Sequence, residues 1–182
     1  MKLNEFVNYL EGNFNNEEQF KKMKENNIKY PFCEHTNTVC NNKIKNLPKD
    51  FQGVFMVEES YYTDGDVKRT SPHLFLFEEV SEGIKLTSYE IPNGYNKDTF
   101  TYKELKEVDY NELKESSKFT PAIYKYENGV YKGGSVSMFS PVLKFTLYED
   151  FTKDYLSVSE SMEVNGKRTF GYDYPIIYKR VI

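Results

Sequence analysis

Apolar residues recur at helical spacing over the first part of the chain. Leu3, Phe6, Val7, Leu10 and Phe14 would share one face of a helix. The Asn- and Gly-rich stretch 12–16 is expected to end this helix. A second short helix is predicted over 17–25, with acidic residues in its first turn. Residues 1–27 are therefore predicted to be a helical N-terminal segment.

After Tyr30 the pattern changes to short apolar or alternating runs that are typical of strands. Residues 63–66 (TDGD) and 81–83 (SEG) are predicted turns. The charged stretch 102–115 predicts a short surface helix or an excursion between strands. The predicted strands cover 53–62, 73–79, 84–91, 122–127, 130–138, 142–148, 156–164, 167–172 and 176–181.

Two Asn-Gly pairs, at 128–129 and 165–166, each separate two strand-like runs. A type I′ hairpin turn needs positive φ at both central residues, which Asn and Gly tolerate best. We therefore expect 122–127 to pair with 130–138, and 156–164 to pair with 167–172.

About eight to ten short strands after a helical start predict an antiparallel all-β fold. An open sheet of this size exposes its edges, whereas a closed barrel has none. We predict a single calycin/lipocalin-like antiparallel β-barrel domain over 1–182, with strands over 31–182 and one or two N-terminal helices. The apolar face of the first helix would close one barrel end or cover a sheet face. A two-sheet sandwich is the alternative.

Composition narrows the class of protein. Among 182 residues there are 16 Tyr and 14 Phe but no Trp, so aromatic residues supply much of the core. The net charge of −4, without a basic cluster, argues against nucleic acid as the main partner. No apolar run approaches the length of a transmembrane helix, and the N-terminus lacks the apolar region of a signal peptide. We expect a cytoplasmic protein without a membrane span.

Cys33, His35 and Cys40 lie close together in the sequence. On a strand, Cys33 and His35 would point the same way, and Cys40 would point to the opposite face. A structural zinc site needs four ligands, and His73 is the other histidine of the chain. We therefore predict no metal site and interpret the cysteines as small buried apolar residues.

Glu58 and Glu59 are adjacent on a predicted strand, so one of them must point into the barrel. A buried carboxylate needs a partner, which Arg168 or Arg180 could supply. The pattern leaves open which glutamate faces inward, because a shift of one residue exchanges the two faces. The inward glutamate would form an internal ion pair or contact a ligand nitrogen.

Several short motifs occur in order along the chain: LEGNFNNEEQ at 10–19, FMVEESY at 55–61, YKG at 131–133, GKRTFG at 166–171 and YPIIY at 174–178. In these residues the chain resembles the CpcT/CpeT-type phycobiliprotein chromophore lyases. The resemblance implies a calycin barrel, often a homodimer, that binds an open-chain tetrapyrrole (a bilin) and delivers it to a cysteine of an acceptor phycobiliprotein. Two arginines of the family, suited to bilin propionates, have no counterpart in 71–77, although Lys68 and Arg69 precede this stretch.

We therefore expect a divergent lyase-like barrel that binds a small apolar or tetrapyrrole-like ligand. Two other functions stay open: a bilin lyase, and a protein-interaction module whose barrel is filled by side chains. An open pocket on the order of a few hundred Å³ with a charged residue inside would favour ligand binding. The inward glutamate would contact pyrrole N–H groups, and His73 or Arg168 a ligand carboxylate. The predicted ligand-binding residues are Glu58, Glu59, Tyr61, His73, Tyr124 and Arg168.

Overall fold

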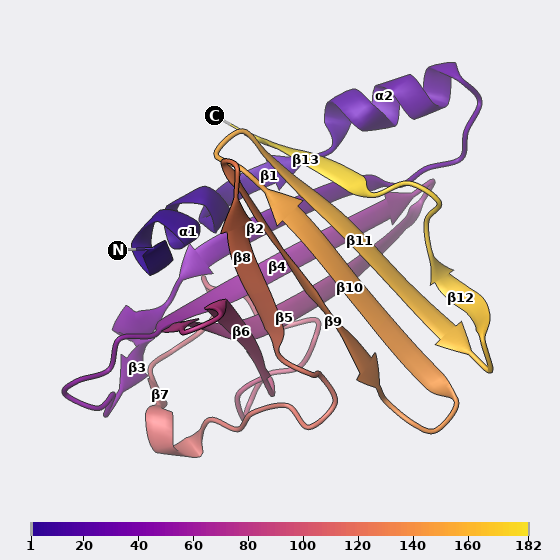
Figure 1. Ribbon diagram of the computed structural model, residues 1–182. Helices are drawn as coiled ribbons and strands as arrows, with labels where there is room; N and C mark the ends of the chain where they lie inside the picture. The colour runs from indigo at the N-terminus through magenta and orange to yellow at the C-terminus, as the bar shows by residue number, and fades with distance from the viewer. Residues whose placement is uncertain (1, 182) are drawn as a thin grey trace.

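The chain folds into a closed antiparallel β-barrel of ten strands with two short helices near its N-terminus (Figure 1). The computed structural model describes residues 2–181. The ring of strands runs in the order β10-β9-β8-β6-β5-β4-β2-β1-β13-β11, and β10 pairs with β11 to close it. The calycin-like barrel is thus confirmed, and the sandwich alternative is not.

The ten strands of the ring take their bounds from the alternating runs and the turns between them. They are β1 Gly12–Asn15, β2 Phe32–Val39, β4 Val54–Asp64, β5 Val67–Val80, β6 Gly83–Tyr89, β8 Ala122–Glu127, β9 Val130–Met138, β10 Leu143–Phe151, β11 Tyr155–Val164 and β13 Ile176–Arg180. A further strand, β12 (Lys167–Gly171), pairs with the second half of β11 outside the ring. The helices are α1 (Lys2–Leu10) and α2 (Glu17–Glu25).

Both Asn-Gly pairs form the predicted hairpin turns. Asn128 and Asn165 have φ of 51° and 50°, and the glycines that follow have φ of 86° and 76°. Positive φ at both central residues is the condition for a type I′ turn, which matches the twist of the flanking strands. The predicted pairing of β8 with β9, and of β11 with β12, is confirmed.

Residues 12–15 differ from the prediction, because they form a strand as well as ending the first helix. Strand β1 lies between β2 and β13 and so joins the start of the barrel to its last strand. Phe14 points inward and is buried. Only four residues form this strand, too few for an alternating pattern to be visible in the sequence.

Strand β5 begins at Val67, six residues before the predicted start at His73. Pro72 lies in the added part, which pairs with β4 but not with β6, because the β5–β6 pairing begins at Leu74. This part of β5 is therefore an edge, where proline is tolerated although it cannot donate a backbone hydrogen bond. Residues 67–72 (VKRTSP) had no strand signal of their own, because they lack an alternating apolar pattern.

Helix α1 closes one end of the barrel (Figure 1). Its Phe6 has no exposed surface and packs against aromatic rings from four strands, at centroid distances of 4.9–5.3 Å. The four partners are Phe77, Tyr124, Tyr131 and Phe151. This confirms the expected place of the first helix and shows that side chains fill this end of the barrel.

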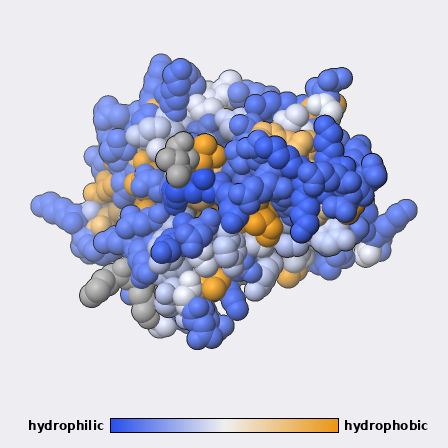
Figure 2. Space-filling view, turned by 90° about the horizontal axis from the view of Figure 1, so that it is seen from above, coloured by the Kyte–Doolittle hydropathy of each residue, from blue (hydrophilic) through white to orange (hydrophobic). Residues whose placement is uncertain are grey.

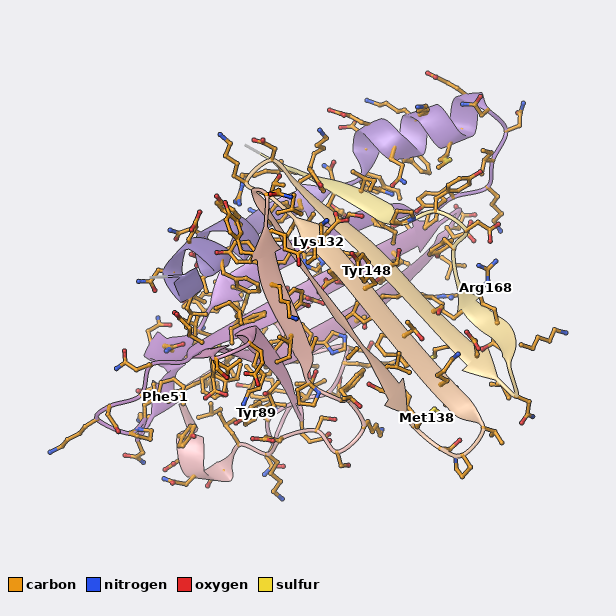
Figure 3. All side chains as sticks on the ribbon, in the orientation of Figure 1. Phe51, Tyr89, Lys132, Met138, Tyr148 and Arg168 are labelled. Carbon is orange, nitrogen blue, oxygen red and sulfur yellow. The ribbon has the colours of Figure 1, made fainter. Side chains whose placement is uncertain are left out.

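A second apolar cluster lies outside the barrel. The long connection between β6 and β8 folds over the outer face of β4 and β5, where Phe100 and Leu105 cover Phe55 and Leu74. Within 102–115 it forms a two-residue strand, β7 (Val108–Asp109), paired with β3 (Ile44–Lys45), and a short 3₁₀ turn at Tyr110–Glu112. The stretch is thus an excursion rather than a surface α-helix. Figure 3 shows Phe51 and Tyr89 of this cluster beside the β6–β8 connection.

The surface is mostly polar. Seen from above, hydrophilic residues cover most of the molecule and apolar residues appear as separate small areas (Figure 2). None of the helices within residues 2–181 has the length and apolar character needed to cross a membrane.

Candidate functional site: an acidic cavity inside the barrel

A cavity of about 300 Å³ occupies the half of the barrel that α1 does not fill. Its walls come from the parts of the strands farther from α1, and Arg69 lies among its lining residues near the turn between β4 and β5. Such a volume lies at the lower end of the range for small-molecule sites. The barrel is therefore not filled by side chains.

Three glutamates from three strands line this cavity: Glu58 on β4, Glu149 on β10 and Glu160 on β11. The Tyr124 hydroxyl donates to Oε2 of Glu149, and the Tyr62 hydroxyl donates to Oε2 of Glu160 at 3.2 Å. The Ser60 hydroxyl lies 3.3 Å from Oε1 of Glu58. No Lys or Arg within residues 2–181 forms a salt bridge with any of the three.

Burial raises the pKa of all three carboxyl groups. Removal from water is the largest cause in each case, because it disfavours the charged form. The negative charges of Glu149 and Glu160 raise the pKa of Glu58 further, to well above its usual value. For Glu149, burial outweighs the tyrosine hydrogen bond and raises the pKa to about 7. The cluster therefore holds protons near neutral pH.

Two histidines line the same cavity, His35 from β2 and His73 from β5. Burial lowers the pKa of both to about 4, so both rings are neutral near pH 7. His35 Nδ1 lies 2.9 Å from the Ser60 hydroxyl, and its Nε2 lies 3.6 Å from Oε2 of Glu58. His73 Nε2 lies 3.0 Å from the Ser71 hydroxyl. These contacts join neutral rings to polar neighbours and supply no positive charge.

The rest of the wall is largely aromatic. Phe119, Phe139 and Phe145 form a cluster with ring centroids 5.0–5.6 Å apart, and Phe75 stacks on His73 at 5.2 Å. The cavity thus has an apolar side and an acidic side, which is the arrangement that orients an amphipathic ligand.

The structure brings together three of the six predicted site residues. Glu58 and His73 line the cavity, and Tyr124 contacts it through its hydrogen bond to Glu149. Glu58 is the inward glutamate, which answers the question that the sequence left open.

The other three predicted residues lie elsewhere. Glu59 points away from the cavity and accepts hydrogen bonds from the Tyr61 hydroxyl at 2.7 Å and the Tyr102 backbone at 3.1 Å. Tyr61 is on the same outer face. Arg168 lies on β12, as labelled in Figure 3, where it is exposed and forms a salt bridge with Asp173 at 2.5 Å. Neither Arg168 nor Arg180 supplies the partner that we predicted for an inward carboxylate; Arg180 instead donates to backbone carbonyls of 8, 9 and 11.

Sequence reasoning missed Glu149 and Glu160, although the signal for both was present. Strand β10 places Phe145, Leu147 and Glu149 on one face, and β11 continues its inward face from Val158 to Glu160. Extending the two-residue period past the apolar positions would have predicted both as inward carboxyl groups.

The two cysteines lie in different apolar clusters. Cys33 is buried inside the barrel with His35 on the same strand face, as predicted, whereas Cys40 follows the end of β2 and belongs to the outer cluster. Both thiols are free, and burial raises the pKa of each to about 12. Each therefore stays in the unreactive thiol form near neutral pH.

Comparison of the sequence with protein-family models finds no match, and comparison with curated proteins finds none either. The resemblance to the chromophore lyases therefore stays a prediction. Among residues 2–181, no group of three or more His, Cys, Asp and Glu side chains is placed to hold a metal ion.

Proposed function

We propose that this protein binds a small, largely apolar molecule with N–H donors inside its barrel. The observation that supports this is the open cavity of about 300 Å³, which has aromatic walls and three carboxyl groups that form no salt bridge with a Lys or Arg of residues 2–181. Carboxyl groups accept hydrogen bonds from N–H donors, and aromatic rings bury an apolar body.

The inward side chains beside the carboxyl groups are small, which favours this proposal over a filled interaction module. Ser60, Ser71, Ser88 and Ser135 all line the cavity, at positions where larger apolar residues would fill it. An open polar interior costs stability that a filled core would provide. Positions that violate good packing are expected where a protein has a binding function.

A pair of adjacent substitutions on β9 tests this proposal. Ser135 faces the cavity, whereas Val136 faces outward and is 55% exposed. We expect Ser135→Phe to weaken binding of a neutral fluorescent probe, N-phenyl-naphthylamine, by at least about tenfold because the added ring occupies the cavity. Val136→Phe adds the same ring outside and should leave the probe affinity unchanged. Equal effects of the two variants, or no binding of the probe by the unsubstituted protein, would refute the proposed site.

A tetrapyrrole is the specific ligand that the family resemblance suggests. The inward orientation of Glu58 supports it, since that carboxyl group is available to pyrrole N–H groups, and Arg69 is one cationic residue of the lining for a propionate. Delivery of a bilin to an acceptor cysteine is the finer proposal, and it depends on such binding.

Titration with biliverdin, phycocyanobilin and haem tests the tetrapyrrole proposal through the visible spectrum. A tetrapyrrole ligand would give micromolar binding with a changed spectrum, weakened by Glu58→Gln and unaffected by Glu59→Gln on the outer face. If none of the three binds at ~100 μM, a tetrapyrrole ligand is excluded. The dissociation constant then lies above ~100 μM, so the free energy of binding is weaker than about −5.5 kcal/mol.

A further inference from the structure

The cavity is lined by more acidic than basic side chains. Its lining includes Glu58, Glu149 and Glu160 against a single Arg or Lys, Arg69, whose side chain is exposed. Its histidines are neutral near pH 7, as described above. The inside of the barrel therefore combines three acidic groups with no buried cation among the described residues.

Glu149 and Glu160 each keep one carboxyl oxygen available to a ligand. Glu149 and Glu160 use Oε2 for a tyrosine hydroxyl, and Oε1 has no hydrogen-bond partner within residues 2–181. The Asn37 side-chain oxygen is the one fully buried polar side-chain atom of the described chain without a partner. The Oε1 atoms of Glu149 and Glu160 are not among such fully buried atoms, so both are accessible from the cavity.

Three buried acidic groups, of which Glu160 raises the pKa of the other two, are costly in a barrel that serves only as a scaffold. Burying an ionised group without a partner costs several kcal/mol, and well-packed apolar residues are often more stable even than a buried ion pair. A positively charged ligand group would remove this penalty, because it pairs with the carboxylates and donates N–H hydrogen bonds to their oxygens.

A bare metal ion does not fit this arrangement, because no three ligating side chains of residues 2–181 lie close enough together to hold one. An ammonium group has three N–H donors that point in different directions, so it can contact carboxyl oxygens from different strands. The aromatic cluster of Phe119, Phe139 and Phe145 provides the surface for an attached ring or chain. The faces of aromatic rings also attract a positively charged group.

We propose that the cavity selects an organic cation, namely a primary or secondary amine on a compact aromatic or aliphatic body, with its nitrogen between Glu149 and Glu160. This inference rests on the proposed ligand-binding function and specifies, in place of an anionic tetrapyrrole, the ligand class that the charges of the cavity favour. The body lies against the phenylalanines, and Glu58 is the third acceptor.

Three probes of nearly equal shape test the inference: phenethylamine, phenethyl alcohol and hydrocinnamate, which carry a positive, a neutral and a negative head group. Calorimetric titration near pH 8 should give an affinity for the amine at least about tenfold above that for the alcohol, and no measurable binding of the anion. Near pH 5.5 the amine affinity should fall by about 30-fold, since binding then requires removal of a proton from a group with pKa near 7. The alcohol affinity should not follow this pH dependence.

Matched variants locate the selectivity. Glu149→Gln and Glu160→Gln keep the size of the side chain and remove its charge, so each should reduce the ratio of amine to alcohol affinity by about tenfold. Glu163→Gln removes a carboxylate that points outward on the same strand as Glu160 and pairs with Lys144 at 2.8 Å, so it should leave the ratio unchanged.

The outcomes separate this inference from the proposed function. Binding of all three probes with similar affinity, or preference for the alcohol or the anion, would overturn the amine inference and leave the ligand-binding proposal standing. Failure of all three, together with failure of N-phenyl-naphthylamine, would overturn both. Amine selectivity that persists in both glutamine variants would place the amine elsewhere and also overturn the inference.

Discussion

Replacing Phe6 by alanine is expected to lower the free energy of unfolding by about 3–5 kcal/mol, the usual range for a fully buried phenylalanine. Phe6 has no exposed surface, and its ring contacts rings from β5, β8, β9 and β10. Removing it leaves a space where α1 closes the barrel, and the surrounding strands are held by backbone pairing and cannot collapse into it. The loss therefore includes a cavity term in addition to lost burial.

Urea unfolding monitored by circular dichroism measures this effect. Asn8→Ala, an exposed position of the same helix, is the control and should change stability by less than about 0.5 kcal/mol. If the alanine variant does not fold, Phe6→Leu should show a smaller measurable loss. A loss below about 1 kcal/mol for Phe6→Ala would contradict the role of α1 as the closure of the barrel.

The second large effect concerns Glu149 and pH. Its pKa is raised by burial from 4.5 to about 7 in the folded protein, so the folded state binds its proton more tightly than the unfolded chain. The resulting stability is fully present below about pH 4.5 and is lost as the pH rises through about 7. A shift of this size corresponds to about 3 kcal/mol.

Glu149→Gln removes this titration and keeps an acceptor for the Tyr124 hydroxyl. We therefore expect the stability of the variant relative to the unsubstituted protein to be about 2.5 kcal/mol more favourable near pH 8 than near pH 5. Denaturant unfolding at both pH values measures this difference. Asp150→Asn, at the neighbouring position of β10 that faces outward, is the matched control. A pH-independent effect of Glu149→Gln would show that Glu149 is not buried in an acidic cavity.

The pH dependence of the free energy of unfolding also contains contributions from other groups that face the cavity. Comparing the variant with the unsubstituted protein separates the Glu149 contribution from theirs. Glu58 and Glu160 also have raised pKa values, so their contributions are likewise lost as the pH rises. His35 and His73 act in the opposite sense, because their lowered pKa values of about 4 make stability fall as the pH drops below about 6.5. The contributions of Glu160 and the two histidines are common to both proteins in the comparison. Glu149→Gln also removes a charge that raises the pKa of Glu58, and this change adds to the loss of the Glu149 titration in the same direction.

The barrel could be predicted from the sequence because its signals are local. Asn128-Gly129 and Asn165-Gly166 specify their hairpins through φ angles that few other residues adopt. The spacing of Leu3, Phe6 and Leu10 predicts the amphipathic helix that closes one end. Strand β1 could not be predicted, because its pairing with β2 and β13 is a long-range property that four residues do not encode.

The site was only partly predictable for the same reason. The choice between Glu58 and Glu59 depends on which face of β4 points into the barrel. The sequence does not show this, because β4 begins with apolar residues on both faces. The covering of Phe55 and Leu74 by the β6–β8 connection is what makes the outer face of β4 apolar as well. Arg168 was expected inside because a buried carboxylate needs a partner, yet β12 lies outside the ring of strands. The missing partner is the feature on which the amine inference rests.

A crystal structure with brominated phenethylamine bound near pH 8 tests the account most directly. The anomalous signal of bromine would mark the ring, and the electron density would mark the amine. We expect bromine beside Phe119, Phe139 and Phe145, with the nitrogen within hydrogen-bond distance of Glu149 and Glu160. Bromine found only on the outer surface, or an empty barrel in crystals soaked to saturation, would contradict it.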